Sequence, residues 1–168
     1  LFLPTPPNPT KVYVGSYDAT LVIAAILFSI IASYAALHIS IRIRHFAEAT
    51  SKIAWSLISA SILGIAIWAT HFIVMLALSL PCVVNYNLLI SLLSIIPAVL
   101  ASWMALFGTW QHRAKPLSPL VGSVLLSGGM AIMHHIGMTA MQMEGLVRYD
   151  FTLFHWSILV APTLSVFA

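Results

Sequence analysis

The chain has 168 residues, of which 61% are hydrophobic and 7% are charged, and its formal net charge is +3. Because a soluble domain usually carries about a quarter charged residues, this composition excludes an ordinary soluble enzyme and indicates an integral membrane protein. No stretch interleaves basic and aromatic residues as a nucleic-acid-binding surface would, so the positive charge is interpreted as a signal of membrane topology.

The chain begins with a proline-rich segment, residues 1–16, which has no basic run before an apolar core and so does not resemble a signal peptide. We predict that it is an extended external segment and that residues 17–168 form one membrane domain. Asp18 is expected to cap the first helix. The fold class predicted is an all-α membrane bundle of about five transmembrane helices, since a crossing needs about 20 apolar residues. The predicted spans are Ala19–Ile41, Ile53–Leu80, Leu88–Trp110, Leu117–Met143 and Thr152–Ala168.

Prolines and asparagines set the predicted breaks. Pro81 with Asn85 and Asn87 separates the second span from the third. Pro97 is expected to kink the third span rather than end it. The fifth span is at the short end for a crossing, and we therefore expect the sequence to be a fragment of a longer protein.

Basic residues set the predicted orientation. The first connection carries Arg42, Arg44 and Lys52, and the third carries Arg113 and Lys115. The second has no charge, and the fourth has one basic residue against two acidic ones. By the positive-inside rule, the first and third connections are cytoplasmic and the N-terminus is outside. The second and fourth spans are then parallel.

Two histidine–methionine pairs stand inside those parallel spans, at His71-x-x-x-Met75 and His134-x-x-x-Met138. Residues four apart share one face of a helix. His71 lies ten residues before Pro81 and His134 ten residues before Glu144, which is about 15 Å, so both are expected at one depth in the outer half of the membrane. Imidazole and thioether ligands together favour copper, especially Cu(I).

A weak internal repeat of period 63 aligns Ile67–Leu78 with Met130–Met141. Membrane proteins often place a site where such repeats meet. In the second copy Met130, His134, Met138 and Met141 form one stripe, although such a stripe alone is more often flexible packing. The predicted metal ligands are His71, Met75, His134, Met138 and Met141, with Met133, Met130 and His135 as weaker candidates. His135 points about 100° away from His134 and is expected mainly to pack beside the site, with direct binding as the alternative.

These motifs resemble the MHYT domain, a bacterial membrane sensory module named after a Met-His-Tyr-Thr motif. The resemblance covers nearly the whole chain. Thr70 and Val74 depart from the first motif, where the family has methionine and glycine, and His135-Ile136 stands where the family has Tyr-Thr. The matching segments are Tyr17-Asp18-x-x-Leu21-Val22, Ser33-Tyr34-x-Ala36-Leu37, Gly64-x-x-x-Trp68-x-x-His71-Phe72-x-x-Met75 and Gly128-Gly129-x-x-x-Met133-His134-His135-Ile136-Gly137-Met138-x-x-Met141.

The resemblance implies a multi-pass sensor of the bacterial inner membrane, with its metal motifs toward the outer side. The family has seven spans and a third motif in the sixth, so its last spans are absent from this sequence. Family members are usually fused to cytoplasmic domains that make or degrade cyclic di-GMP, and the family is proposed to bind copper and to sense O2, CO or NO. The implied partners are the lipid bilayer, a diatomic gas and a cytoplasmic signalling domain or partner protein.

Other functions remain open at this stage. His71 and His134 could be axial ligands of a haem b. The methionine stripe could instead belong to a copper carrier or to an accessory subunit of a membrane oxidase, or the bundle could be purely structural. An enzyme is not expected, because the chain has no paired carboxylates, Ser-His-Asp set, phosphate-binding glycine loop or Cys-x-x-Cys motif, and only a redox metal site could supply catalysis.

Overall fold

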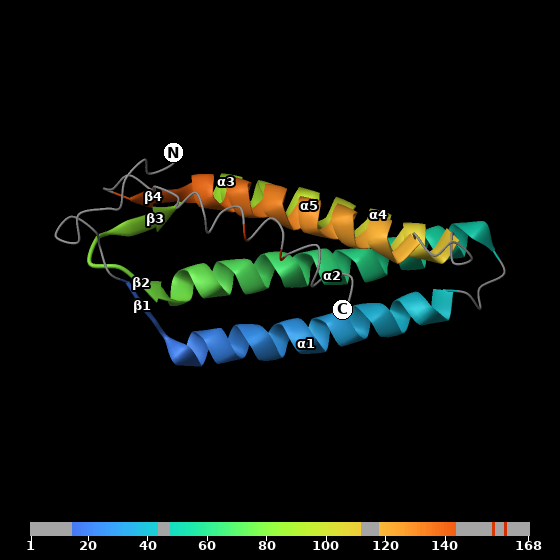
Figure 1. Cartoon of the computed structure of the whole chain (residues 1–168), viewed down its shortest axis with the longest axis horizontal. Coiled ribbons are helices and arrows are strands. Elements are labelled where there is room, and N and C mark those ends of the chain that lie inside the picture. The colour runs from blue at the N-terminus through green and yellow to red at the C-terminus, as the bar shows by residue number, and fades with distance from the viewer. Residues whose placement is uncertain (1–14, 44–47, 112–117, 144–155, 157–159, 161–168) are drawn as a thin grey trace.

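The computed structural model describes residues 15–43, 48–111, 118–143, 156 and 160. Within these residues it is an all-α membrane bundle whose long helices lie side by side (Figure 1). Four helical stretches are long and apolar enough to cross a membrane, which confirms the first four predicted spans. The predicted fifth span, Thr152–Ala168, lies outside the described residues apart from Trp156 and Val160. The helices are α1 (Ala19–Arg42), α2 (Ala49–Ala77), α3 (Leu88–Leu93), α4 (Ile95–Gln111) and α5 (Ser118–Ala140).

The third predicted span consists of two helices, α3 and α4, separated by a turn at Ser94. Pro97 explains the position of this break. A proline cannot donate to the carbonyl four residues earlier and its ring clashes with that carbonyl, which here belongs to Leu93, the last residue of α3. The Ser94 hydroxyl donates to the Ser91 carbonyl oxygen at 2.6 Å. Pro97 was expected to kink the third span. Within that one span the structure instead has two helices, which meet at Ser94, about one turn before the proline.

Four short strands at one end of the bundle were not predicted. They are β1 (Ser16–Tyr17), β2 (Leu78–Ser79), β3 (Val84–Tyr86) and β4 (Met141–Met143). Strand β1 pairs with β2 and β3 pairs with β4, both antiparallel. The second and fourth spans were predicted to run to Leu80 and Met143, and they end earlier because these residues pair as strands instead of continuing a helix.

The strands divide the described chain into two units of one design, which we call the first unit (β1-α1-α2-β2) and the second unit (β3-α3-α4-α5-β4). The last helix of each ends at an alanine, Ala77 or Ala140, so the ends are 63 residues apart, the period of the predicted repeat. The Asp18 backbone N–H donates to the Ala77 carbonyl at 2.9 Å, and the Asn87 N–H donates to the Ala140 carbonyl at 2.8 Å. A backbone hydrogen bond therefore joins the beginning and the end of each unit.

Asp18 and Asn87 also cap the first helix of their units. An Asp18 carboxylate oxygen accepts from the N–H of Thr20 at 2.8 Å and of Leu21 at 3.3 Å, which confirms the predicted cap. The Asn87 side-chain oxygen accepts from the Ile90 N–H at 3.2 Å. Such caps satisfy N–H groups that have no partner inside the helix.

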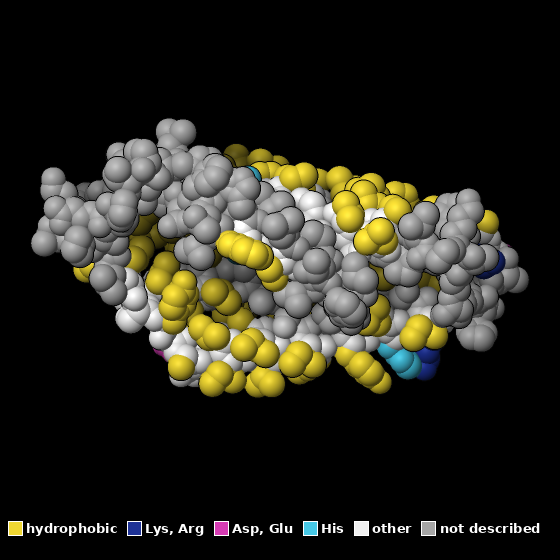
Figure 2. Space-filling model, in the orientation of Figure 1, with side chains coloured by type: hydrophobic (Ala, Val, Ile, Leu, Met, Phe, Trp, Pro, Cys, Tyr) yellow, Lys and Arg dark blue, Asp and Glu magenta, His cyan; other side chains and the backbone are white. Residues whose placement is uncertain are grey.

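Small residues form the buried core, and large apolar residues cover the surface (Figure 2). Helix α1 packs on α2, α2 on α4, and α4 on α5. At Gly64 the backbone of α2 lies directly against Val99 of α4, and Gly129 of α5 lies against Ala101. Lipid tails are as apolar as leucine, so close packing of small residues, rather than burial of large ones, holds helices together in a membrane. The buried apolar residues include Ala25, Ala36, Ala60, Ala66, Ala98 and Ala101.

Candidate metal centre

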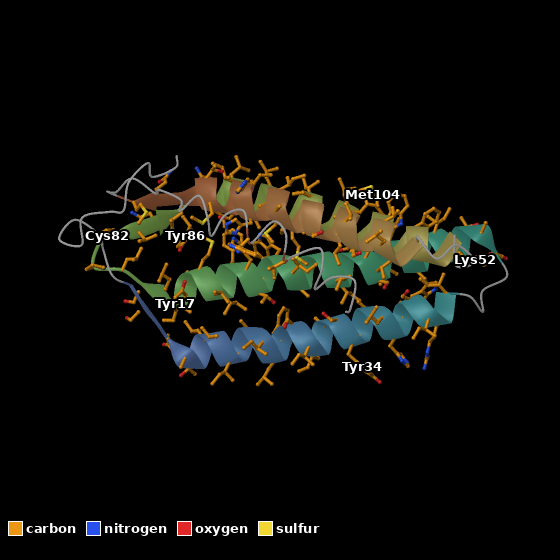
Figure 3. The ribbon with its side chains drawn as sticks, viewed as in Figure 1. Tyr17, Tyr34, Lys52, Cys82, Tyr86 and Met104 are labelled. Atoms are coloured by element: carbon orange, nitrogen blue, oxygen red, sulfur yellow. The ribbon has the colours of Figure 1, made fainter. Side chains whose placement is uncertain are left out.

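His71 and His134 meet at the interface of the two units. Each lies six residues before the end of its helix, α2 or α5, which is about 9 Å along the axis. Their ring centroids are 4.9 Å apart, with the ring planes at 70°. The predicted parallel course of these two helices and the common depth of the two histidines are confirmed. Figure 3 shows the side chains between these helices, near the end where Tyr86 is labelled.

Gly137 provides the space for the His71 ring. A Cβ atom at this position would lie 2.9 Å from His71 Nε2 and 3.3 Å from its Cδ2. The glycine is three residues after His134 and so on the same side of α5. The imidazole of the first unit therefore rests directly on the backbone of the last helix of the second unit.

His71 Nε2 is buried and has no hydrogen-bond partner. Buried polar atoms are nearly always paired, and an exception calls for an explanation. A neutral imidazole nitrogen is a good ligand for copper, zinc or iron. A buried nitrogen without a partner, beside a second histidine, therefore fits a bound metal ion.

The separation of the rings discriminates between two kinds of metal centre. An imidazole ring centre lies roughly 3 Å from a metal bound at about 2 Å from nitrogen, so two rings on one tetrahedral ion are roughly 5 Å apart. Two axial histidines on opposite faces of a haem iron would be roughly 6 Å apart, with the porphyrin between them. The observed 4.9 Å fits a shared tetrahedral ion.

The predicted methionine stripe is helical only in part. Met130, His134 and Met138 lie on α5, whereas Met141 lies on β4, because the helix ends at Ala140. Met75, Met130, Met138 and Met141 are all half-buried. Met133 is the most buried methionine described, at 3% exposure, and shares a stripe with Gly129, which contacts α4. Among the described residues no three His, Cys, Asp or Glu side chains converge. In the described part of the chain, the thioethers on the same helices are therefore the soft side chains that remain as candidate ligands beside the pair.

His135 is exposed, and its ring lies beside that of His134 with the centroids 5.9 Å apart. This position matches a neighbour of the site better than a ligand. Among the other histidines, His38 is exposed and stacks on Tyr34 at 5.9 Å. His45, His112 and His155 lie outside the described residues.

Aromatic side chains make one wall of the site. The Phe72 ring lies 5.3 Å from His71, 5.0 Å from Trp68 and 6.5 Å from Tyr86. The Trp68 indole N–H donates to the Ser91 carbonyl at 2.9 Å and to the Ser94 hydroxyl at 3.0 Å, so the break between α3 and α4 positions this wall.

Tyr86 was missed by the sequence reasoning. Its hydroxyl donates to the Met75 carbonyl oxygen at 3.4 Å, which joins β3 to the last turns of α2. Burial raises the pKa of this hydroxyl, so it remains a protonated donor at neutral pH. The signal that could have revealed it is a repeated dipeptide, because Tyr86-Asn87 occupies the same place in the second unit as Tyr17-Asp18 in the first.

Curated relatives were found in several bacteria. In Pseudomonas aeruginosa, the "Bifunctional diguanylate cyclase/cyclic di-GMP phosphodiesterase MucR" is 35% identical over 152 residues, covering 90% of this chain and 22% of the relative. The "Cyclic di-GMP phosphodiesterase NbdA" of the same organism is 36% identical over 146 residues, covering 87% of this chain and 18% of the relative. The "Signaling protein YkoW" of Bacillus subtilis is 32% identical over 150 residues, covering 89% of this chain and 18% of the relative.

The chain spans about a fifth of the length of these relatives. No solved structure matches it. The profile of the MHYT family, described as "Bacterial signalling protein N terminal repeat", matches residues 64–122 and 128–168. The two matches begin at Gly64 and Gly128, the first residues of the two histidine motifs. They cover more than half of the chain, which therefore belongs to the MHYT family of bacterial membrane signalling domains.

Proposed function

We propose that this membrane domain binds one copper ion, as Cu(I), between His71 and His134 and senses a diatomic gas there. The observation that carries the proposal is the histidine pair itself, with a ring separation that suits a shared tetrahedral ion and a buried nitrogen that has no other partner. Met75, Met138 and Met141 are the candidate thioethers that complete the set. Such neutral ligands suit a low-dielectric site, where a carboxylate would be costly to bury.

Copper would supply a coordination position open to O2, CO or NO. The protein's own residues hold the imidazoles in place, with Gly137 under His71 and Phe72 against its edge. Because the two histidines belong to different units, a change at the site would shift α2 relative to α5. Both helices begin at the opposite, basic end of the bundle, which the positive-inside rule assigns to the cytoplasm. That shift would be the signal.

The output proposed is cyclic di-GMP signalling. Relatives that share this domain are named as a diguanylate cyclase and as phosphodiesterases of cyclic di-GMP, and they are about four to five times as long as this chain. A cytoplasmic signalling domain, in the same protein or in a partner, would read the helix shift. The location proposed is the bacterial inner membrane, with the strand-bearing end outside.

A resident ion is favoured over a carrier by the interior beyond the site. Toward the basic end, the buried polar side chains of the described residues are serine hydroxyls, which are poor ligands for Cu(I). Met133 and Met130 lie one and four residues before His134 in that direction. Beyond them the remaining methionine toward that end is Met104, whose side chain is on the outside of the bundle, 43% exposed. The buried serines toward that end are Ser56, Ser59, Ser102, Ser123 and Ser127.

The test is the metal and haem content of the detergent-purified protein, by elemental analysis with an optical spectrum. We expect about one Cu(I) per chain after anaerobic loading, and its loss in the His71→Ala/His134→Ala double variant. His38→Ala is the matched control, because His38 stacks on Tyr34 away from the site. Copper-free protein after loading would overturn the proposal, and a haem absorption band that disappears in the double variant would replace it with the haem alternative.

A further inference from the structure

The β3–β4 sheet has one covered and one exposed face. Tyr86 pairs with Met141 and Val84 pairs with Met143. Successive residues of a strand point to opposite faces, and exposure follows this alternation, because Asn85 and Gln142 are exposed while the other four residues are half-buried. Met141 and Met143 therefore share the covered face of the sheet.

The covered face is linked to the histidine pair through the Phe72 ring. Tyr86, the cross-strand neighbour of Met141, donates to the Met75 carbonyl and contacts Phe72, which itself contacts His71. Opposite residues of an antiparallel pair have Cβ atoms about 5 Å apart, so the Met141 side chain begins beside the Tyr86 ring. Met143 is one step farther along the same face, about 7 Å from Met141, in the direction of the loop where Figure 3 labels Cys82.

The corresponding sheet of the first unit carries no sulfur. There Tyr17 pairs with Leu78 and Ser16 with Ser79. Leu78 and Met141 are equivalent positions, each directly after the alanine that ends the helix of its histidine. Of these two sheets, only the one whose tyrosine contacts Phe72 beside His71 carries thioethers.

We propose that Met143 and Met141 form an uptake route by which Cu(I) reaches the His71–His134 site from the strand-bearing end. This inference rests on the proposed function. Met143 binds the incoming ion, Met141 then forms a new Cu–S bond as the bond to Met143 breaks, and the imidazoles receive the ion last, with no change of oxidation state. Thioethers suit this task because they are soft, uncharged and carried on flexible side chains.

The experiment measures loading rate and affinity separately. All variants carry Cys82→Ser, which removes the chain's one thiol as a competing ligand. Cu(I) is delivered as a coloured bicinchoninate complex to protein in nanodiscs, and the loss of absorbance gives the rate of transfer. For Met143→Leu we expect transfer several-fold slower than in the parent, with equal final copper per chain and an unchanged equilibrium affinity. Met104→Leu, on the outside of α4, should load like the parent.

A rescue variant separates sulfur chemistry from shape. Met143→Cys, in the same background, should restore fast loading, whereas Met143→Ser should not. An unchanged rate in Met143→Leu would overturn the route, and so would equal slowing in Met104→Leu. Loss of copper at equilibrium in Met143→Leu would also overturn it, by making Met143 a ligand of the resident ion. A parent protein that binds no copper at all would instead reject the proposed function, and the route with it.

Discussion

Tyr17 and Tyr86 occupy the same place in the two units, directly before the residue that caps the first helix. Tyr17 is 61% exposed, whereas Tyr86 is covered by Phe72 and hydrogen-bonded to the last turns of α2. The second unit covers the end of the first, and nothing described covers the first unit's own tyrosine. The proposed metal site therefore depends on the contact between units, because each contributes one histidine. The predictions below separate what each unit does alone from what that contact adds.

The largest effect is expected for Gly64→Ala, which disturbs the contact between units. The new Cβ would lie 2.5 Å from Val99 Cα and 2.7 Å from Val99 N, and backbone atoms cannot yield without moving α4. We expect the free energy of unfolding to fall by about 1–3 kcal/mol, as for other overpacked cores. The measurement is SDS-induced unfolding in mixed micelles followed by circular dichroism. Gly128→Ala is the control, since no atom lies within 4 Å of its new Cβ, and equal losses in both variants would contradict the prediction.

Gly137→Ala should affect binding more than folding. Its Cβ would displace the His71 ring, which is a side chain and can rotate away, so little stability should be lost. The copper affinity should fall by about 10- to 100-fold, the usual consequence of disturbing the surroundings of a metal ligand. Competition with a Cu(I) chelator measures this affinity, with Gly128→Ala again as the control. An affinity equal to that of the parent would show that His71 need not lie on Gly137 to bind.

The caps compare the two units directly. Asp18→Ala should lower the free energy of unfolding by about 1 kcal/mol, because the side chain satisfies two N–H groups. Asn87→Ala should lower it less, since that side chain accepts one bond. Asp18→Asn keeps an acceptor and should remain close to the parent. SDS unfolding tests all three, and a larger loss for Asn87→Ala than for Asp18→Ala would reverse the order expected.

The smallest effect is expected for Tyr86→Phe. Removal of the hydroxyl deletes the bond to Met75, which is long and partly buried, so about 0.5 kcal/mol should be lost. Tyr17→Phe, in the exposed equivalent, should change nothing measurable. If both variants unfold like the parent, Tyr86 stabilises the protein through its ring and not through its hydroxyl.

Tyr86 also predicts how the free energy of unfolding changes at alkaline pH. The raised pKa of folded Tyr86 means that, above the unfolded tyrosine pKa of about 10, the unfolded chain loses this proton first. Stability that is fully present below that pH should therefore decline as the pH rises through the folded pKa. Tyr86→Phe should remove this part of the decline, as measured by SDS unfolding at pH 9 to about 12. An identical decline of the free energy of unfolding with pH in the parent and in Tyr86→Phe would contradict this prediction.

Much of the fold could be predicted because hydropathy and basic residues report directly on membrane crossing. The four described spans, the Asp18 cap and the parallel course of the histidine helices all follow from local patterns or from the alternation of sides. The short strands do not, because Leu78–Ser79 and Met141–Met143 follow the helices without a proline, glycine or charged residue that would mark the helix ends. Their partners, β1 and β3, are remote in sequence. The strands pair because the packed helices bring them to the same end of the bundle.

The site was predicted in part for a similar reason. Helical spacing places His71 with Met75 and His134 with Met138, and the common depth brings the two pairs to one level. Spacing within one helix says nothing of what the neighbouring helix offers. Tyr86 and Gly137 owe their roles to contacts across helices and strands, and only a comparison of the two units could have suggested the tyrosine.

The hydrogen bonds from Asp18 to Ala77 and from Asn87 to Ala140 bear on how the number of units in such a protein can change during evolution. Each joins two backbone groups, so it tolerates divergence of the side chains, as the change from Asp to Asn illustrates. A unit closed in this way satisfies the terminal carbonyl of its last helix without help from the next unit. Gene duplication can therefore add or remove whole modules without leaving that carbonyl unpaired. The Tyr-Asp dipeptide of the first unit occurs again in the sequence at Tyr149-Asp150. This position is beyond the described residues and 63 positions after Tyr86-Asn87.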